Sequence, residues 1–433
     1  MRVPKGFQQI PGLSICPSEW KVVQADDICS KITKGTTPPK SDIVKDSDIP
    51  FLRVNNLTFE GRLNTDNEVL FVSESAHRGF LARSIAYPND ILMNIVGPPL
   101  GKIVLLPDTF DEYNLNQAII IYRLEQEKVN KAYFLNYLKS NYAQYWLRSR
   151  SKKTSGQQNL TIELCKELPV PLPEIYEQQK IAQILSTWDK VIEKLEALIA
   201  AKQKRKKALM QQLLTGKKRF AVSEEEWKEV RLGDVGTISS AGVDKKIVSG
   251  EPEVRLLNFL DVFRRSFLFN KEIEHVVTAP IAKIKKCDIK KGDIFFTPSS
   301  ETREELAISA VAMEDMPGVV YSYHIVRFRL HADWDLKFRA YVFQSEGFCR
   351  QAYFLGDGSG QRYVISQDNF KNMTVKVPSY SEQKMIGSVL CSADKEIETH
   401  QKQLVALKEQ KKGLMQQLLT GKKRVQVKVE EAA

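Results

Sequence analysis

The sequence predicts a mixed α/β (α+β) protein, with two globular modules joined by two long antiparallel coiled-coil helices in a pseudo-two-fold repeat. Three observations predict this fold class: an internal repeat of half the chain, a heptad pattern in each copy, and short strand-like runs between the copies. The 433 residues, 42% hydrophobic and 27% charged, fit a globular protein of two or three domains.

The repeat is carried by an eleven-residue segment, LMQQLLTGKKR, which occurs unchanged at residues 209–219 and 414–424. The same offset of 205 residues matches Glu177-Gln178 with Glu382-Gln383 further upstream. An identity of this length indicates an internal duplication, and its period of half the chain indicates a duplicated unit rather than a solenoid.

Each copy predicts one long helix. Apolar residues recur with strict 4-3 spacing over residues 181–213 and again over 386–418, which is typical of a coiled coil. Pro173 and Pro378 precede these stretches, and glycine follows each of them, as expected at helix ends. Polar residues at seam positions set register at a cost in stability. They are Lys202, Lys206, His400 and Lys411.

Two interpretations of the helices stay open. They pack on each other within one chain, antiparallel, or they serve in simple dimerisation with Lys and Arg on a solvated face. Two copies of one helix in a single chain favour the first interpretation, in which the helices act as a spacer between the modules.

The segments before the helices also correspond, and they predict a β-rich module followed by a helical segment in each half. Trp20-Lys21 pairs with Trp227-Lys228, and Ser155-Gly156-Gln157 pairs with Ser359-Gly360-Gln361. An aromatic-rich helical pattern precedes each Ser-Gly-Gln element, at residues 132–148 and 338–350. The predicted domains are residues 1–173 and 220–378 for the modules, and residues 174–219 and 379–433 for the helices, the last with a C-terminal tail.

The formal net charge of +11 indicates a polyanionic partner. Most of this charge lies in two segments. Residues 202–219 contain eight Lys and Arg and no acid, and residues 402–424 contain seven Lys and Arg and one acid. The rest of the chain is close to neutral. We therefore expect the modules themselves to attract a polyanion weakly.

The six cysteines form no CxxC pair, and no apolar run approaches the 18 residues of a membrane span. Both features favour a cytoplasmic protein without a membrane partner. Five dispersed histidines predict no metal site, and residues 215–218 lack the glycine and the Ser or Thr of a phosphate-binding loop. The glycine cluster at residues 356–360 is interpreted as a turn. We expect no catalytic residues and no metal ligands.

Several features occur in both halves: Glu-Gln at the helix start, LLTGKKR at the helix end, a Pro-rich strand end before the helix, and the Trp-Lys and Ser-Gly-Gln elements. With these features the chain resembles the specificity subunit of type I restriction–modification systems. The resemblance covers essentially the whole chain. It implies two target recognition domains that each read one half of a bipartite, asymmetric DNA site. It also implies two methyltransferase subunits, which bind S-adenosylmethionine and methylate adenine N6, and motor–nuclease subunits, which use ATP and Mg²⁺. No cofactor is then expected in this chain, and the subunit itself is expected to be no enzyme.

Candidate DNA-contacting residues are those whose side chains read base edges or neutralise phosphates in loops of the two modules. A purely structural role stays open for each. In the first module they are Lys34, Thr36, Thr37, Arg53, Asn55, Asn56, Gln157, Gln158 and Asn159. In the second module they are Arg255, Asn258, Ser359, Gln361, Arg362 and Tyr363.

The basic helix ends have three interpretations: docking of a methyltransferase subunit, contact with DNA phosphates, or solubility of the helices. The candidate interface residues are Lys204, Arg205, Lys206, Lys207, Gln211, Gln212, Lys411, Lys412, Gln416 and Gln417.

Two rival functions stay open. One is a coiled-coil DNA-binding adaptor or scaffold without a methyltransferase partner, and the other is a stand-alone modifying enzyme with a divergent active site. The paired modules speak against a plain scaffold, and the missing cofactor loop speaks against the enzyme.

Overall fold

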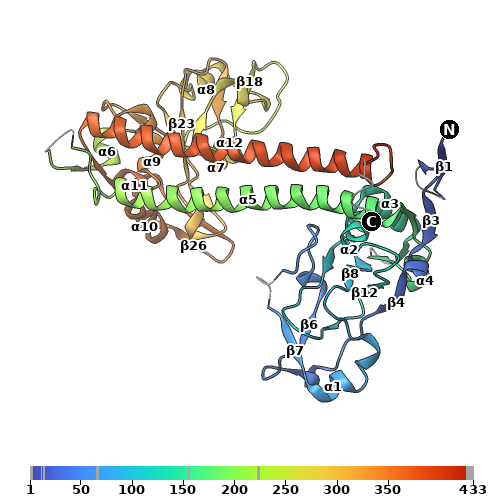
Figure 1. The fold of residues 1–433 in the computed structure, drawn as a ribbon. Coiled ribbons are helices and arrows are strands. Elements are labelled where there is room, and N and C mark those ends of the chain that lie inside the picture. Colours follow the sequence, from blue (N-terminus) through green and yellow to red (C-terminus); the bar gives the residue numbers. More distant parts are fainter. Residues whose placement is uncertain are drawn as a thin grey trace. The chain divides into compact units, whose positions relative to one another are not determined.

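The computed structural model divides the chain into two compact units, each with one globular module and half of each long helix (Figure 1). Unit 1 comprises residues 1–195 and 403–433, and unit 2 comprises residues 196–402. We call residues 1–173 module 1 and residues 220–378 module 2; these predicted domain limits stay a prediction. The structure describes residues 3–10, 12, 15–64, 68–154, 157–221 and 225–425.

Module 1 contains two four-stranded sheets, in the orders β10-β8-β12-β4 and β11-β6-β7-β5. The first sheet is antiparallel, and its strand β12 has the sequence IIIYRL, whose β-branched and aromatic residues suit a buried strand. In the second sheet β11 runs parallel to β6. The strands are β4 (Cys29–Lys34), β8 (Ile91–Asn94), β10 (Ile103–Leu105), β12 (Ile119–Leu124), β5 (Ile43–Val44), β6 (Pro50–Leu52), β7 (Leu70–Val72) and β11 (Asn114–Leu115).

The helices of module 1 begin at side-chain caps. Asn130 accepts hydrogen bonds from the backbone N–H groups of Ala132 and Tyr133, and Ser140 and Thr161 cap the next two helices in the same way. The single helical pattern predicted for residues 132–148 is therefore two helices, because the Ser140 cap interrupts it. The helices are α1 (Glu74–Arg78), α2 (Lys131–Lys139), α3 (Asn141–Arg150) and α4 (Ile162–Lys166).

Module 2 repeats this topology. Its five-stranded sheet, β17-β25-β21-β23-β19, contains the counterparts of all four strands of the first sheet of module 1, and β18 pairs with β20 and, in parallel, with β24. The strands are β17 (Gly236–Ser239), β18 (Glu253–Leu257), β19 (Phe267–Leu268), β20 (Val276–Thr278), β21 (Ile294–Phe296), β23 (Ser309–Ala312), β24 (Val319–Tyr321) and β25 (Val326–Leu330). The helices are α6 (Leu232–Val235), α7 (Phe259–Phe263), α8 (Ile281–Lys286), α9 (Leu336–Val342), α10 (Glu346–Leu355) and α11 (Gln367–Asn372).

Smaller sheets complete each module. A strand at the module opening pairs with the strand before the long helix, and a three-stranded sheet, which we call the hairpin sheet, follows α3 or α10. The opening pairs are β3 (Lys21–Gln24) with β15 (Pro169–Leu172) and β16 (Lys228–Arg231) with β28 (Thr374–Val377). The hairpin sheets are β9 (Val96–Gly97), β14 (Gln157–Asn159) and β13 (Lys152–Thr154), and β22 (Ser299–Ser300), β27 (Arg362–Val364) and β26 (Asp357–Ser359). Module 1 begins with a hairpin of β1 (Phe7–Gln9) and β2 (Ile15–Pro17).

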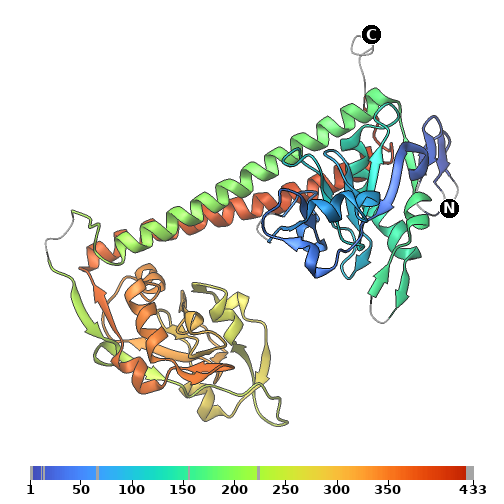
Figure 2. The same cartoon turned by 90° about the horizontal axis from the view of Figure 1, so that it is seen from below.

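The two long helices are α5 (Ile175–Leu213) and α12 (Tyr380–Leu418), 39 residues each, which appear as continuous green and red helices in Figures 1 and 2. Their bounds differ by the same 205 residues as the sequence repeat. Each helix begins in one unit and ends in the other.

The helices contribute to the core of the module beside them. In unit 1, Ile181 and Leu185 from the start of α5 and Leu418 from the end of α12 lie in one cluster with Trp20 and Tyr133. In unit 2, Leu213, Ile386 and Leu390 join a cluster that contains Phe338 and Phe370. Burial of these apolar side chains contributes about 1.5–3 kcal/mol each, so each module and its helical halves form one packed unit.

Among the described residues, we find no helix that combines the length and the apolar character needed to cross a membrane.

Candidate nucleic-acid interface

The predicted seam of the coiled coil is the contact surface between the helices. Of the predicted seam residues, Ile192, Ile199 and Ile397 are buried, and none of the rest is fully exposed. Within each unit the helices run antiparallel, because partners that advance along α5 step backward along α12. The heptad pattern of the sequence is confirmed.

The lysines that interrupt the seam are paired with acids of the opposite helix. Lys206 Nζ lies 2.6 Å from Asp394 Oδ1 in unit 2, and Lys411 Nζ lies 2.5 Å from Asp189 Oδ1 in unit 1. The two pairs are the same interaction repeated, since each partner is displaced by 205 residues. Lys202 pairs with Glu396 in addition. The predicted interface residues Lys206 and Lys411 therefore lie inside the coiled coil.

The other repeated residues form one polar cluster in each unit. Glu382, at the start of α12 and fully buried, accepts hydrogen bonds from the Arg219 guanidinium at 2.9 Å and from the Trp227 indole N–H at 3.1 Å. In unit 1 the carboxylate of Glu177 accepts the same bonds from Arg424 and Trp20. Burial raises the pKa of the Glu177 carboxyl, and hydrogen bonds from the Val425 N–H and the Trp20 indole oppose this.

The glutamines that follow these glutamates bind the modules to the helices. The amide oxygen of Gln178 accepts the Asn130 N–H at 2.9 Å, and its amide N–H donates to the carbonyl of Pro173. Gln383 makes the same two contacts with Asp335 and Pro378. Much of the repeated sequence is thus accounted for by contacts within the chain.

A second part of the repeat stays on the surface. In both copies of LMQQLLTGKKR the leucines at the fifth and sixth positions are buried, and the two glutamines and two lysines are exposed. The exposed repeated residues are Gln211, Gln212, Lys217, Lys218, Gln416, Gln417, Lys422 and Lys423. The predicted interface residues Lys204, Arg205, Lys207 and Lys412 are exposed as well.

The predicted DNA-contacting loop after β4 is held by its backbone and by hydroxyl groups. A Cβ at Gly35 would meet the Asn116 carbonyl oxygen at 2.2 Å, so only glycine fits there. Thr36 Oγ1 lies within hydrogen-bond distance of Arg83 Nε and Ser84 Oγ, and Thr37 Oγ1 lies 3.5 Å from the Gln117 N–H. Lys34, at the end of β4, is exposed.

The predicted cluster after β6 is partly structural. Asn56 is fully buried, and its amide bonds the backbone of Arg53 and Asn64, so in this structure it does not present a base-reading edge. The Arg53 guanidinium donates to the carbonyl of Glu68, and Asn55 is exposed.

In module 2 the corresponding candidates are also engaged. The Arg255 guanidinium donates to the Asn270 carbonyl at 2.9 Å, and the Asn258 amide bonds the Leu256 carbonyl and the His275 ring. These contacts hold the loops after β18 in place. They also engage the Arg255 guanidinium and the Asn258 amide, the groups through which these residues would contact a base.

The remaining candidates lie on the two hairpin sheets. Gln157, Gln158 and Asn159 form β14, and Gln158 and Asn159 are half-buried. The Gln157 side chain and residues 155 and 156 lie outside what the structure describes. In module 2, Ser359, Gln361 and Arg362 are exposed, and Tyr363 is half-buried.

The hairpin strands correct the alignment of the Ser-Gly-Gln elements. Strands β13 and β14 match β26 and β27 at the offset of 205, whereas the two Ser-Gly-Gln elements are 204 residues apart. The residue equivalent to Gln157 is therefore Arg362, and Gln361 lies in the turn before it.

Sequence reasoning missed Arg303, which lies beside the predicted residues of module 2. Its guanidinium lies over the rings of Tyr363, at 4.7 Å, and Tyr353, at 5.8 Å, and it donates to the Tyr353 carbonyl at 3.2 Å. The Arg362 guanidinium donates to Ser299 Oγ on the neighbouring strand. Arg303 belongs to the loop after β22, where neither repeat nor periodicity marks the residue.

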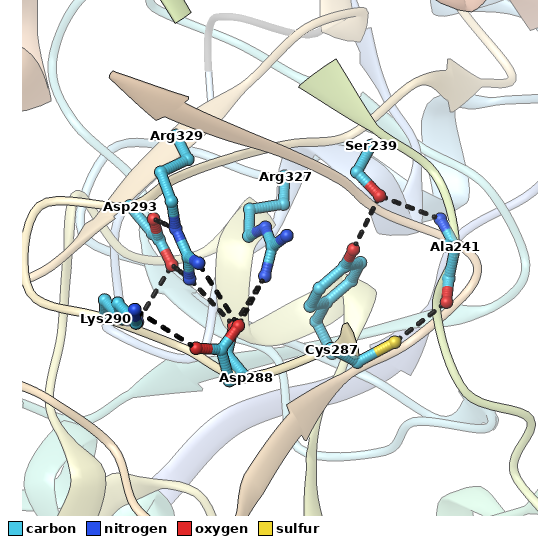
Figure 3. Close-up of polar contacts among 9 residues, drawn as sticks. Ser239, Ala241, Cys287, Asp288, Lys290, Asp293, Arg327 and Arg329 are labelled. Carbon is cyan, nitrogen blue, oxygen red and sulfur yellow. Dashed lines mark hydrogen bonds and ion pairs between the residues drawn. The ribbon is translucent and has the colours of Figure 1, made fainter. Parts of the chain in front are cut away.

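The Asp that directly precedes a central strand, β8 in module 1 and β21 in module 2, has a structural role in both modules. Asp293 receives two hydrogen bonds from the Arg329 guanidinium, at 2.7 and 2.6 Å (Figure 3). In module 1, Asp90 receives two hydrogen bonds from the Arg123 guanidinium. The Asp293 carboxylate raises the pKa of Arg329. In module 2, Arg327 also donates a hydrogen bond to Asp288 (Figure 3). Module 1 has no arginine at the equivalent position.

The described residues contain no group of three or more His, Cys, Asp or Glu arranged to hold a metal ion.

Two α/β modules of one topology, each packed on a share of two paired helices, give the architecture that the sequence predicts for a specificity subunit. Residues 17–202 and 224–409 both match the family described as Type I restriction modification DNA specificity domain. The chain therefore belongs to this family, the specificity subunits of type I restriction–modification systems, whose role is DNA sequence recognition.

Named relatives span nearly the whole chain. The type I restriction enzyme MjaVIII specificity subunit of Methanocaldococcus jannaschii is 26% identical, covering 97% of this chain and 96% of that protein. The putative type I restriction enzyme MjaX specificity subunit of the same organism is 25% identical, over 94% and 95%.

Solved structures share the fold. A chain from a study of complex assembly and conformational transition of the type I R-M system matches with a TM-score of 0.61 at 15% identity, covering 94% of this chain and 99% of that one. The type I restriction–modification S subunit from M. genitalium matches with a TM-score of 0.53 at 15% identity, over 99% of both chains.

Proposed function

We propose that the chain reads an asymmetric, bipartite DNA target, one half through each module, and directs adenine N6-methylation and DNA cleavage by partner subunits. In this proposal the chain catalyses neither step. S-adenosylmethionine, ATP and Mg²⁺ are bound by the methyltransferase and motor–nuclease subunits. A cytoplasmic location is part of the proposal, and the six unpaired cysteine thiols are consistent with it.

The observation that carries the proposal is a contrast between two kinds of surface. The exposed Gln-Gln and Lys-Lys pairs at the helix ends are identical in both copies, whereas the sequences of the two hairpin sheets differ. Two surfaces that bind the same partner are expected to have the same residues. Two modules that read different half-sites are expected to differ in the residues that contact the DNA.

Co-expression with the methyltransferase subunit in a methylation-free host, followed by mapping of N6-methyladenine, tests the function. We expect a split, asymmetric motif with a fixed gap, and exchange of one module is expected to change only its own half. A soluble complex without a motif would favour the adaptor function, and failure to form a complex would overturn the proposal.

The repeated glutamines give a test of the methyltransferase surface. Changing Gln211 and Gln212 to Ala is expected to remove one of two bound methyltransferase subunits, and changing Gln416 and Gln417 as well is expected to remove both. The subunit ratio is measured by native mass spectrometry. Because these side chains are exposed, folding is expected to change little.

The basic run beside them serves as a comparison. Lys204 and Arg205 correspond to Glu409 and Gln410 in the second copy, so this charge is not repeated. Reversal of Lys204, Arg205 and Lys207 to Glu tests the DNA-phosphate interpretation, and Lys206 is left unchanged because it pairs with Asp394. Loss of DNA affinity with intact assembly would support contact with phosphates.

A further inference from the structure

The part of module 1 where α3 passes into β13 is strongly cationic. Arg148 and Arg150, at the end of α3, and Lys152, at the start of β13, are all exposed. We call these three residues the α3–β13 cations. They belong to a segment, residues 128–162, that contains seven Lys and Arg and no Asp or Glu. Its positive charge is therefore not balanced by acids of the same segment.

The α3–β13 cations are also not neutralised by the fold. Among the residues that the structure describes, none of the three has a carboxylate oxygen within 4.0 Å. Other cations of module 1 do, as Arg123 shows with Asp90 at 2.8 Å. A cluster of cations without carboxylate partners repels itself, and it gains stability when an external anion is bound.

Neutral contacts hold the two arginines in place. The Arg150 guanidinium lies over the Trp146 ring, 4.5 Å from its centre, and Arg148 Nε donates to the Gln144 carbonyl at 3.2 Å. These contacts orient the side chains and leave their charge intact. Lys152 pairs in the hairpin with Asn159, so the cations adjoin the amide-rich strand β14.

The cationic surface is absent from the second module. At the offset of 205 residues, the α3–β13 cations correspond to Tyr353, Leu355 and Asp357. The equivalent segment, residues 333–367, contains four basic and four acidic residues. The surface thus differs between the halves, unlike the helix ends, so a partner that binds both halves alike does not account for it.

We propose that the α3–β13 cations contact the phosphates of duplex DNA beside the half-site read by module 1, with β14 placed toward the bases. This inference rests on the proposed function and deepens it. Phosphate contacts position a protein, and adjacent amides read base edges. Module 2 lacks these charges, so module 1 supplies more of the salt-dependent part of DNA affinity.

The test uses the complex assembled with its methyltransferase subunits and a duplex that carries the mapped motif. The variant R148Q/R150Q/K152Q is compared with wild type by fluorescence anisotropy at several KCl concentrations. Each phosphate contact adds about 0.9 to the slope of log affinity against log salt, so the variant is expected to lower the slope by about 2.7. Affinity at low salt is expected to fall on the order of 100-fold.

The variant K128A/K131A/K166A is the matched control. It removes the same charge from the same module, at residues whose ammonium groups contact Glu125, Asn89 and Asp26. Its slope is expected to stay near the wild-type value. The methylated motif is expected to be unchanged in both variants, because phosphate contacts carry no sequence information.

Two results would overturn the inference while leaving the proposed function in place. One is an unchanged salt slope in the α3–β13 variant with specific binding retained. The other is loss of methyltransferase assembly in that variant, which would make the surface a protein-docking site. Failure of the wild-type complex to bind the motif specifically would overturn the proposed function itself.

Discussion

Glu177 and Glu382 show how a single residue joins three segments of the chain. Each carboxylate lies at the start of a long helix and binds the arginine after the end of the other helix and the tryptophan that opens the module. A buried carboxylate needs such partners, because an uncompensated charge in the interior is costly. This requirement explains why Glu, Arg and Trp recur in both halves.

Replacing Glu382 by Gln is therefore expected to destabilise unit 2. The amide cannot accept both charge-assisted hydrogen bonds, and the expected cost is about 1–3 kcal/mol. Urea unfolding measures the loss, and hydrogen exchange at the start of α12 locates it.

The matched control is Glu193→Gln. Glu193 pairs with Arg62 at the surface, where its side chain is 60% exposed. Its replacement is expected to change stability by less than about 0.5 kcal/mol. Equal effects of the two variants would contradict the role given to Glu382.

Lys139, at the end of α2, is a half-buried lysine whose ammonium contacts a neutral carbonyl. Its ammonium donates to the carbonyl of Glu60 at 2.5 Å, and burial lowers its pKa to about 8, with a further contribution from Lys411. Between pH 8 and the ordinary value of 10.5, the folded chain binds fewer protons at this residue than the unfolded chain. Stability from this group therefore rises with pH across that interval.

Lys139→Met is expected to stabilise unit 1 by about 1–3 kcal/mol at pH 7, because it removes a half-buried charge whose desolvation lowers its pKa. The gain is expected to shrink as pH rises above 8 and to vanish near 10.5. Unfolding midpoints of both proteins across this pH range measure it. Lys131→Met, at the exposed start of the same helix, is expected to show no such pH dependence.

At the scale of elements, two features of the long helices determine how they pair. The apolar seam defines which faces meet, and the paired charges Asp189–Lys411 and Asp394–Lys206 define the register at which they meet. Asp394 also accepts a hydrogen bond from Tyr341 at 2.7 Å, so the second pair ties module 2 to its helix.

Asp189→Ala is expected to destabilise unit 1 by about 2 kcal/mol, since it leaves the Lys411 ammonium, 9% exposed, without its partner. The double variant D189A/K411M is expected to recover to within about 1 kcal/mol of wild type, because the lone charge is gone. A double-mutant cycle from urea unfolding compares them. Additive effects would show that the two residues act independently.

Elements were predictable where a period or a repeat marked them, and less so where a single cap decided the structure. The 4-3 spacing of residues 181–213 and 386–418 predicts the last residues of α5 and α12, and both helices begin six residues before it. The aromatic pattern of residues 132–148 predicts helix throughout, yet Ser140 ends one helix and caps the next. A serine cap is a local hydrogen bond that periodicity does not register.

At the scale of the whole molecule, the net charge of +11 is concentrated at the helix ends. Three of the cations there, Lys202, Lys206 and Lys411, form ion pairs within the chain. The positive charge left for DNA at the helix ends is therefore smaller than the number of Lys and Arg there indicates, so the partner subunits are expected to supply much of the electrostatic attraction.

The isolated chain is therefore expected to bind its target weakly at physiological salt, near the micromolar or weaker range (~10⁻⁶ M) of non-specific binding. Gel shift of a motif-bearing duplex against a scrambled one, with and without the methyltransferase subunit, measures this. Nanomolar specific binding by the chain alone would contradict it.

The sequence by itself determined the duplicated architecture, the two long helices and the family, because repeats and heptads are properties of residue order. The tertiary structure alone decided which polar residues are available. Asn56, Arg255 and Lys411 have the same chemistry as surface residues that contact DNA or a partner. Yet Asn56 is fully buried, and Arg255 and Lys411 are occupied by contacts with residues distant in sequence. Burial and pairing arise from long-range contacts, and residue type does not reveal them.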